Sequence, residues 1–301
     1  MSGNLLTIRK KIKSVKNTRK ITKAMQLVAA SKMKQFQRKA LSARSYAKDL
    51  LKILHNNLSD LGKSILTEER ESGKILFILY TSDKGLCGAL NARMIRGLFD
   101  SSKWKNLSKE EKLLITIGKK SYDYARYNKI HVAKSFKSLN ENMQAIDALE
   151  IVDLIINFWK EQEIKEVIMV SPHYKSPIVF YPVMKTYLPF SEDMIERHVS
   201  AEEIAEGKER KKDIFTKEEY MIFEPSKEDF RDALLQQVVQ TLFTQSFYEL
   251  KASEYSSRMM AMQSATDAAD EMVDKLTLSL NKARQAIITQ EIAEIVGGAM
   301  A

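Results

Sequence analysis

Residues 17–36 read NTRKITKAMQLVAASKMKQF, a basic stretch without an acidic residue, a glycine or a proline. Its apolar residues recur every three to four positions, which is the period of one face of an α-helix. Taken alone, the stretch fits part of a longer helix, a helix that binds nucleic acid, or a mitochondrial transit peptide. The rest of the sequence decides among these interpretations.

The glycines and prolines leave two long segments uninterrupted. None of the 10 glycines and 5 prolines lies between Asn4 and Leu61, and none lies between Ser226 and Val296. Both segments keep a helical spacing of apolar residues, and because Gly and Pro are the main helix breakers, each segment predicts one unbroken helix. The pattern of the first segment continues past residue 50, which disfavours a transit peptide.

Two helices of this length would each leave an apolar stripe in water. The simplest way to bury both stripes is to pair the helices as an antiparallel coiled coil. Pro225 and Ser226 precede the second helix, and Gly297 and Gly298 end its periodic pattern. A helical bundle with additional loops stays open as an alternative.

The centre of the chain alternates between strand-like and helical segments. The helical segments are 91–100, 119–127 and 142–162, and residues 200–215 form a polar, exposed excursion with no core of its own. Strands alternating with helices predict a Rossmann-like α/β domain with a largely parallel sheet. The sequence thus predicts an N-terminal coiled-coil helix (1–62), a central α/β domain (73–225) and a C-terminal coiled-coil helix (226–301). The expected strands are 74–82, 112–118, 129–136, 166–172, 177–184 and 220–225.

The charge is concentrated at the N-terminus. Residues 1–50 contain 14 Lys and Arg but a single acid, Asp49, whereas the whole chain has a net charge of +9. The remaining residues are therefore net acidic, and the basic end predicts an acidic partner. The chain has no apolar run long enough to span a membrane. Its single cysteine, Cys87, excludes an intrachain disulfide.

Sequence motifs for catalysis are missing. Segment TSDKGLCGALN (81–91) follows the first strand and could bring backbone N–H groups near an anion, but it lacks both the dinucleotide and the P-loop patterns. A tight turn with close helix packing is the alternative role for its glycines. The four histidines are scattered, which argues against zinc. We therefore predict no catalytic residues, no metal and no cofactor.

Four segments resemble the γ subunit family of F-type ATP synthase, in its bacterial form. They are IRKKIKSVKNTRKITKAMQLVAASKM (8–33), TSDKGLCGALN (81–91), SRMMAMQSAT (257–266) and LNKARQAIITQEIAEIVGGAMA (280–301), in the family's order along the whole chain. Asp267, where the family usually has Asn, and the long polar segment 200–212 depart from the pattern.

The resemblance implies a non-catalytic rotor shaft, present as one copy per complex. It implies that the chain couples ion-driven rotation of the c ring to conformational cycling of the catalytic β subunits. Its partners would be the α and β subunits of the hexamer, the ε subunit and the c ring, on the cytoplasmic side of the plasma or inner membrane. By match to the family motifs, the expected contacts with the stator are Lys23, Met25, Arg258, Arg284, Gln285, Thr289 and Glu291.

Two other function classes remain as alternatives on residues alone. A basic coiled coil could bind nucleic acid by neutralising phosphates, although segment 17–34 has no aromatic side chain for stacking on bases. A small nucleotide-binding enzyme could be built on the α/β layer. We also expect Met25 and Arg258 to lie on facing sides of the coil.

Overall fold

The computed structural model describes residues 2–57, 64–141, 143, 145–161, 163–196, 198, 223–224 and 226–299. It divides into two units. The first combines Met1–Ser31 with Arg258–Ala301, and the second is Lys32–Ser257. Two helices contribute to both units, α1 (Ser2–Asn57) and α7 (Lys227–Ala299). Both long helices predicted from the breaker-free segments are confirmed.

The second unit contains a five-stranded sheet with the order β3-β2-β1-β4-β5. Strand β1 (Lys74–Tyr80) pairs in parallel with β2 (Lys112–Ile117) and β4 (Ile164–Tyr174), and β2 pairs in parallel with β3 (Lys134–Phe136). Strand β5 (Phe180–Leu188) pairs antiparallel with β4. Six of the seven residues of β1 are buried, as expected for a central parallel strand covered on both faces.

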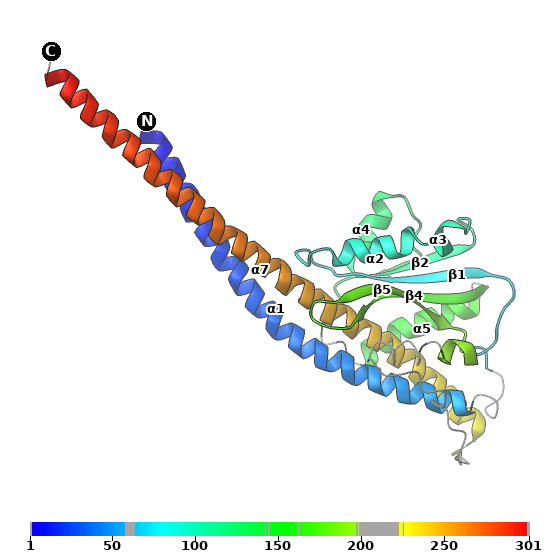
Figure 1. The fold of residues 1–301 in the computed structure, drawn as a ribbon. Helices are drawn as coiled ribbons and strands as arrows, with labels where there is room; N and C mark the ends of the chain where they lie inside the picture. The colour runs from blue at the N-terminus through cyan, green and yellow to red at the C-terminus, as the bar shows by residue number, and fades with distance from the viewer. Residues whose placement is uncertain are drawn as a thin grey trace. The chain divides into compact units, whose positions relative to one another are not determined.

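The helices of this unit cover both faces of the sheet (Figure 1). Helices α2 (Leu90–Phe99), α3 (Ser102–Lys105) and α4 (Lys119–Tyr127) follow β1 and β2, whereas α5 (Ala145–Glu161) leads back to β4. The first crossovers run from β1 toward β3 and the last runs the other way. Right-handed crossovers therefore place α2 and α4 on one face and α5 on the other.

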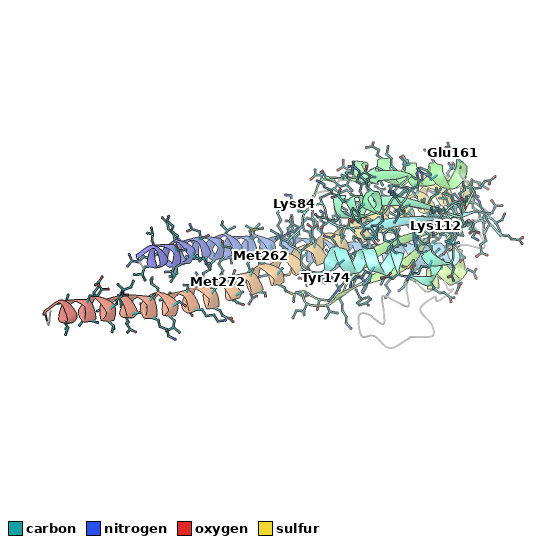
Figure 2. The ribbon with its side chains drawn as sticks, turned by 90° about the horizontal axis from the view of Figure 1, so that it is seen from above. Lys84, Lys112, Glu161, Tyr174, Met262 and Met272 are labelled. Atoms are coloured by element: carbon teal, nitrogen blue, oxygen red, sulfur yellow. The ribbon has the colours of Figure 1, made fainter. Side chains whose placement is uncertain are left out.

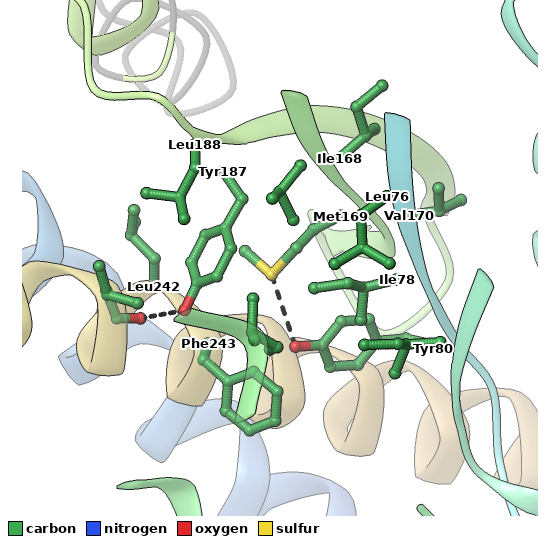
Figure 3. Packing of buried hydrophobic residues seen from close by; sticks show 14 of the residues in the cluster. Leu76, Ile78, Tyr80, Ile168, Met169, Val170, Tyr187, Leu188, Leu242 and Phe243 are labelled. Atoms are coloured by element: carbon green, nitrogen blue, oxygen red, sulfur yellow. Dashed lines mark hydrogen bonds between the residues drawn. The ribbon is translucent and has the colours of Figure 1, made fainter. Parts of the chain in front are cut away.

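Helix α7 packs on the same sheet face as α5, and aromatic side chains fill the contact. The rings of Tyr80 and Phe243 lie 5.8 Å apart between centroids. The hydroxyl of buried Tyr187 donates to the backbone carbonyl of Val239, at 2.5 Å (Figure 3). On α1, Phe36 stacks on Tyr255 of α7 with 5.6 Å between ring centroids. Both long helices therefore share one core with the sheet in this unit.

In the first unit, α1 and α7 form an antiparallel pair. Thr22 of α1 contacts Thr266 of α7, and the lower-numbered Arg19 contacts the higher-numbered Asp270. The seam positions of α7 alternate in steps of four and three, which is the heptad spacing of a coiled coil. Met262 is buried in the seam while Met272 is 52% exposed (Figure 2). The positions with this spacing are all buried or partly buried: Met262, Thr266, Ala269, Val273, Leu276, Leu280, Ala283 and Ile287.

The predicted fold class is confirmed, with smaller differences in the strands. The expected strand 129–136 is limited to Lys134–Phe136, and the expected strand 177–184 is Phe180–Leu188. The polar excursion 200–215 and most of the expected strand 220–225 lie outside the described residues. The three domain boundaries given by the sequence stay a prediction.

Candidate functional site

The first candidate site is the crevice where an α/β sheet usually binds its ligand. That crevice lies at the carboxyl ends of the strands, where the strand order reverses. Here the order reverses at β1, between β2 and β4, and residues 81–89 connect β1 to α2. Gly88 of this loop has φ +55°, in the left-handed region that favours glycine.

Helix α7 packs directly on this loop. The hydroxyl of Ser257 donates to the carbonyl oxygen of Cys87. A Cβ added at Gly88 would lie 3.0 Å from the Oγ atom of Ser257, and residues 251–257 of α7 are all buried. The close approach of α7 therefore explains the glycine, which supports the packing role over the phosphate-binding one.

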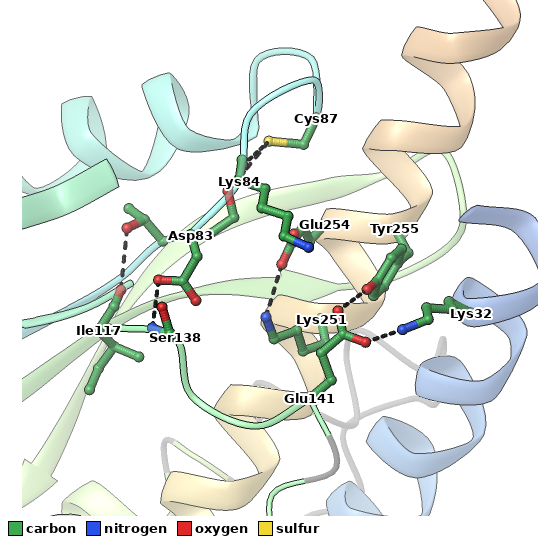
Figure 4. Close-up of polar contacts among 12 residues, drawn as sticks. Lys32, Asp83, Lys84, Cys87, Ile117, Ser138, Glu141, Lys251, Glu254 and Tyr255 are labelled. Atoms are coloured by element: carbon green, nitrogen blue, oxygen red, sulfur yellow. Dashed lines mark hydrogen bonds and ion pairs between the residues drawn. The ribbon is translucent and has the colours of Figure 1, made fainter. Parts of the chain in front are cut away.

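The carboxylate of Asp83 occupies the second position at which an anion could bind. Its Oδ1 atom accepts a hydrogen bond from the backbone N–H group of Lys119, at 2.9 Å. It accepts another from the backbone N–H group of Ser138, at 3.0 Å (Figure 4). Lys119 is the first residue of α4, and helix N-termini attract anions through their free N–H groups. An internal carboxylate thus satisfies donors that a phosphate would use.

The described cysteine and histidine side chains, which could act as nucleophiles or metal ligands, are also scattered over the fold. Cys87 is buried, and its sulfur lies 3.2 Å from the side-chain nitrogen of Asn91. Burial lowers the pKa of His198 to about 3, and its Nε2 atom lies 3.0 Å from the carbonyl oxygen of Thr186. Across the described residues, no group of three or more His, Cys, Asp or Glu is arranged to hold a metal ion.

The second candidate site is the outer surface of the helix pair in the first unit. Most cations of α1 point into solvent there. Among the described carboxylates, only Asp270 pairs with one of them, Arg19. This surface therefore has an excess of positive charge that no described acid of the chain neutralises. The exposed cations are Arg9, Lys10, Lys11, Lys13, Lys16, Arg19, Lys20 and Lys23.

The third candidate site is an apolar stripe near the end of α7, formed by Ile288, Ile292, Ile295 and Val296. These side chains are between 47% and 71% exposed. Their spacing of three and four places them on one face of the helix. Four large apolar side chains on one exposed face indicate a surface that binds a protein partner.

The residues predicted to contact the stator lie at both ends of the first unit. Lys23 is exposed and donates to Gln26, at 3.2 Å, while Met25 is partly buried. Arg258 is 8% exposed. Their roles as contacts, and the facing of Met25 and Arg258, stay predictions. The other four predicted contacts are exposed on two turns of α7: Arg284, Gln285, Thr289 and Glu291.

Comparison with known proteins gives the same family along the whole chain. The family model described as ATP synthase matches residues 4–301. The ATP synthase gamma chain of Pelotomaculum thermopropionicum is 38% identical over 300 residues, covering 99% of each chain. The gamma chain of Heliobacterium modesticaldum is 36% identical over 297 residues, covering 98% of this chain and 97% of the relative. The chain belongs to the ATP synthase gamma chain family.

Solved structures share this gamma chain fold. A chain of the Euglena gracilis mitochondrial ATP synthase, in a structure of OSCP, F1 and the c-ring, aligns with a TM-score of 0.66 at 16% identity. The alignment covers 100% of this chain and 95% of that one. A chain from the central stalk and c-ring of the Tetrahymena thermophila mitochondrial enzyme has a TM-score of 0.58 at 22% identity, covering 81% and 99%.

Sequence reasoning missed two features of this chain. The exposed stripe of α7 was not singled out, although the spacing of Ile288, Ile292 and Ile295 could have identified it. Asp83 was read as part of a glycine loop, and no local pattern links it to Ser138, 55 residues further along the chain. Long-range partners of this kind become visible only in the fold.

Proposed function

We propose that this chain is the central rotor shaft of an F-type ATP synthase. In this proposal it is a non-catalytic subunit, and ATP is made or hydrolysed on the β subunits. The observation that carries it is the match to ATP synthase gamma chains, at 38% identity over 99% of the chain for one relative. The exposed cations of α1 and the apolar end of α7 supply partner surfaces suited to this role.

The proposed partners are the α and β subunits, the ε subunit and the c ring, with one copy of this chain per complex. The chain itself would sit at the cytoplasmic side of the plasma or inner membrane as a peripheral protein. No helix in the described part of the chain is long and apolar enough to cross a membrane. Attachment through the c ring would therefore supply the membrane association.

The shaft would act by binding each β subunit differently at each angle. A ligand shifts a conformational equilibrium only by the difference in its affinity for the two states. In this mechanism the shaft is the ligand, and its asymmetry is the property that biases one β site over the next. The helix pair meets this requirement because one helix carries the surplus cations and the other carries the apolar end.

Exposed charges suit a contact that must be made and broken during rotation. Attraction between solvated charges is weak and is screened within about 10 Å at 0.1 M salt. The cations of α1 can therefore hold the shaft near acidic loops without locking one angle. We place Lys23, Met25 and Arg258 at this contact and residues 284–291 at a second contact with the hexamer.

Co-expression with α and β subunits tests the proposal. We expect the full chain to co-purify with both subunits in a complex that hydrolyses ATP. Removing residues 288–301 deletes the apolar stripe and should lower the yield of the complex. Lys275→Gln serves as a control, because Lys275 is exposed and pairs within its own helix with Glu271, at 3.9 Å.

The same preparation separates the alternatives. Salt-sensitive binding of DNA or RNA by the chain, without α and β, would favour the nucleic-acid interpretation. Saturable nucleotide binding by the chain alone would favour an enzyme built on the α/β layer. If the chain forms no complex with the α and β subunits under conditions where both subunits are folded, the rotor proposal is contradicted.

A further inference from the structure

A buried ion pair joins the two long helices inside the second unit. Arg44 of α1 and Glu249 of α7 approach to 3.0 Å, and their side chains are 6% and 5% exposed. The Nε atom of Arg44 is also 3.3 Å from the Oε1 atom of Glu249. Two charged groups are thus withdrawn from water where the helices contact the sheet.

The pair also binds the backbone of β4 at Tyr174. The Oε2 atom of Glu249 accepts from the N–H group of Tyr174, at 3.0 Å, and the Nη2 atom of Arg44 donates to its carbonyl oxygen, at 2.9 Å. The two helices together therefore hold both the N–H donor and the carbonyl acceptor of one sheet residue, Tyr174 (labelled in Figure 2).

The position of Tyr174 explains why its backbone is available. Strand β1 pairs with β4 only as far as Val170, whereas β4 continues to Tyr174 alongside β5. On the β1 side, the last residues of β4 therefore extend beyond their neighbouring strand. Arg44 and Glu249 supply the hydrogen bonds that a further strand would supply.

Other polar groups complete the surroundings of the carboxylate. The Nε2 atom of Gln245 donates to Oε1 of Glu249, at 3.0 Å, and Nδ1 of His173 lies 3.4 Å from Oε2. The pKa of Glu249 is held well below its usual range. Burial opposes this shift, and the His173 hydrogen bond together with the charges of Arg44 and Lys185 outweighs it. The carboxylate thus stays ionised in a buried place.

Stability alone does not account for such a cluster. Apolar residues of similar volume are often as stabilising as a buried ion pair, because charges lose their hydration on burial. Directional hydrogen bonds add something that apolar contacts lack, which is resistance to sliding and rotation of one surface over another. The ion pair of Arg44 and Glu249 fixes how far each helix is rotated about its own axis, and where it lies along that axis, relative to one residue of the sheet.

We propose that Arg44 and Glu249 form a mechanical joint through which torque passes between the sheet and the helix pair. Both are positioning residues that act through the backbone of Tyr174. The inference rests on the proposed rotor function and deepens it. If the joint slips, the helix pair can still turn within the hexamer during ATP hydrolysis, but less of that rotation reaches the part of the rotor that drives ions.

The test replaces both charges in the complete complex. Arg44→Met with Glu249→Leu removes the pair without leaving a lone buried charge, so the variant chain should assemble with its partners. We expect ATP hydrolysis within twofold of the unaltered complex and a several-fold fall in ions pumped per ATP in membrane vesicles. A merely stabilising pair would leave the ratio of pumping to hydrolysis unchanged, and that result would overturn the proposal.

Two further variants keep the test decisive. Arg44→Lys retains the charge but loses the fork that reaches Glu249 and Tyr174 together. It should show a smaller fall in the same ratio, and a normal ratio in this variant would also overturn the joint. The matched control is Lys103→Met with Glu166→Leu, which removes a 2.7 Å ion pair between α3 and β4. It should pump normally.

Failure of the joint and failure of the rotor function give different results. If the unaltered chain does not assemble with α and β subunits into an active complex, the rotor function is wrong. If it does, and the double variant pumps as many ions per ATP as the unaltered complex, only the joint is wrong.

Discussion

Replacing the buried threonine pair of the helix seam should give strongly non-additive changes in stability. Thr22 and Thr266 are 8% and 4% exposed, and their hydroxyl oxygens lie 2.8 Å apart. Thr22 can also donate to the carbonyl of Arg19, at 3.0 Å, and Thr266 to that of Met262, at 2.7 Å. Two hydroxyl protons are shared among three such contacts, so only two can be made at once.

The magnitude follows from the contact across the seam. In Thr22→Val, the hydroxyl of Thr266 still donates to Met262, but its buried oxygen faces a methyl group where Thr22 had supplied a polar partner. A buried polar group left without its partner costs about 1 to 3 kcal/mol, and we expect each single variant to cost about 1 kcal/mol because the remaining hydroxyl still donates. Val matches the shape of Thr and has a similar helix propensity.

The double variant should cost much less than the two single variants combined. With Thr22→Val and Thr266→Val together, no hydroxyl remains unsatisfied and two methyl groups meet across the seam. Replacing both partners of a hydrogen bond by apolar groups of the same shape is close to neutral. We therefore expect a coupling energy of about 2 kcal/mol between the two positions.

Hydrogen exchange of backbone amides in residues 15–29 and 259–273 measures the local free energy of opening. Thr18→Val and Thr277→Val form the control pair. Both threonines are exposed, and each donates to a carbonyl four residues earlier, at 3.2 Å and 2.7 Å. The free-energy costs of the two control substitutions should add. If the costs of Thr22→Val and Thr266→Val also add, neither hydroxyl depends on the other across the seam and the reasoning is refuted.

Three further outcomes are expected. Leu242→Pro should abolish assembly with α and β subunits, because Leu242 is 3% exposed within α7 and proline costs about 3 kcal/mol or more in a helix interior; normal recovery of the complex would contradict this. Met25→Lys should impair coupling more than folding, since it adds a charge at the proposed stator contact; ion-driven ATP synthesis at the normal rate would count against it. Stability should fall as the pH drops from 6.5 toward 3, by at most about 1.4 kcal/mol per pH unit from His198. The pKa of His198 is lowered to about 3 by burial, so in this range the unfolded chain binds a proton that the folded chain does not. Urea unfolding of His198→Gln should show a weaker pH dependence, and an unchanged dependence would exclude this cause.

The long helices could be predicted because their signal is local. A helix interior tolerates neither glycine nor proline well, so breaker-free segments mark α1 and α7 almost to their ends. The antiparallel pairing followed from the need to bury two apolar stripes. Parallel strands were recognisable for a similar reason, because β1 is buried on both faces and is therefore almost wholly apolar.

The polar cross-links could not be predicted because nothing local announces them. Arg44 reads as one more cation of a basic helix, and Glu249 lies 205 residues away in sequence. Only the fold brings them to Tyr174 and removes both from water. The predicted stator contacts have a related limit. Exposure of Lys23 and Arg284 is compatible with a partner surface, but the partner itself is encoded in other chains.

The sheet of this chain shows how a ligand-binding fold can become a mechanical one. Residues 81–89 lie where related α/β sheets place a phosphate, yet Asp83 binds the N-terminus of α4 and Ser257 of α7 binds the loop carbonyl. A small ligand at this position would bind reversibly and leave the loop mobile. An internal carboxylate and a packed helix are covalently part of the chain, so their effective concentration never falls. The same interactions that would hold a nucleotide instead hold the sheet to α7, which suits a part that must carry load during every turn.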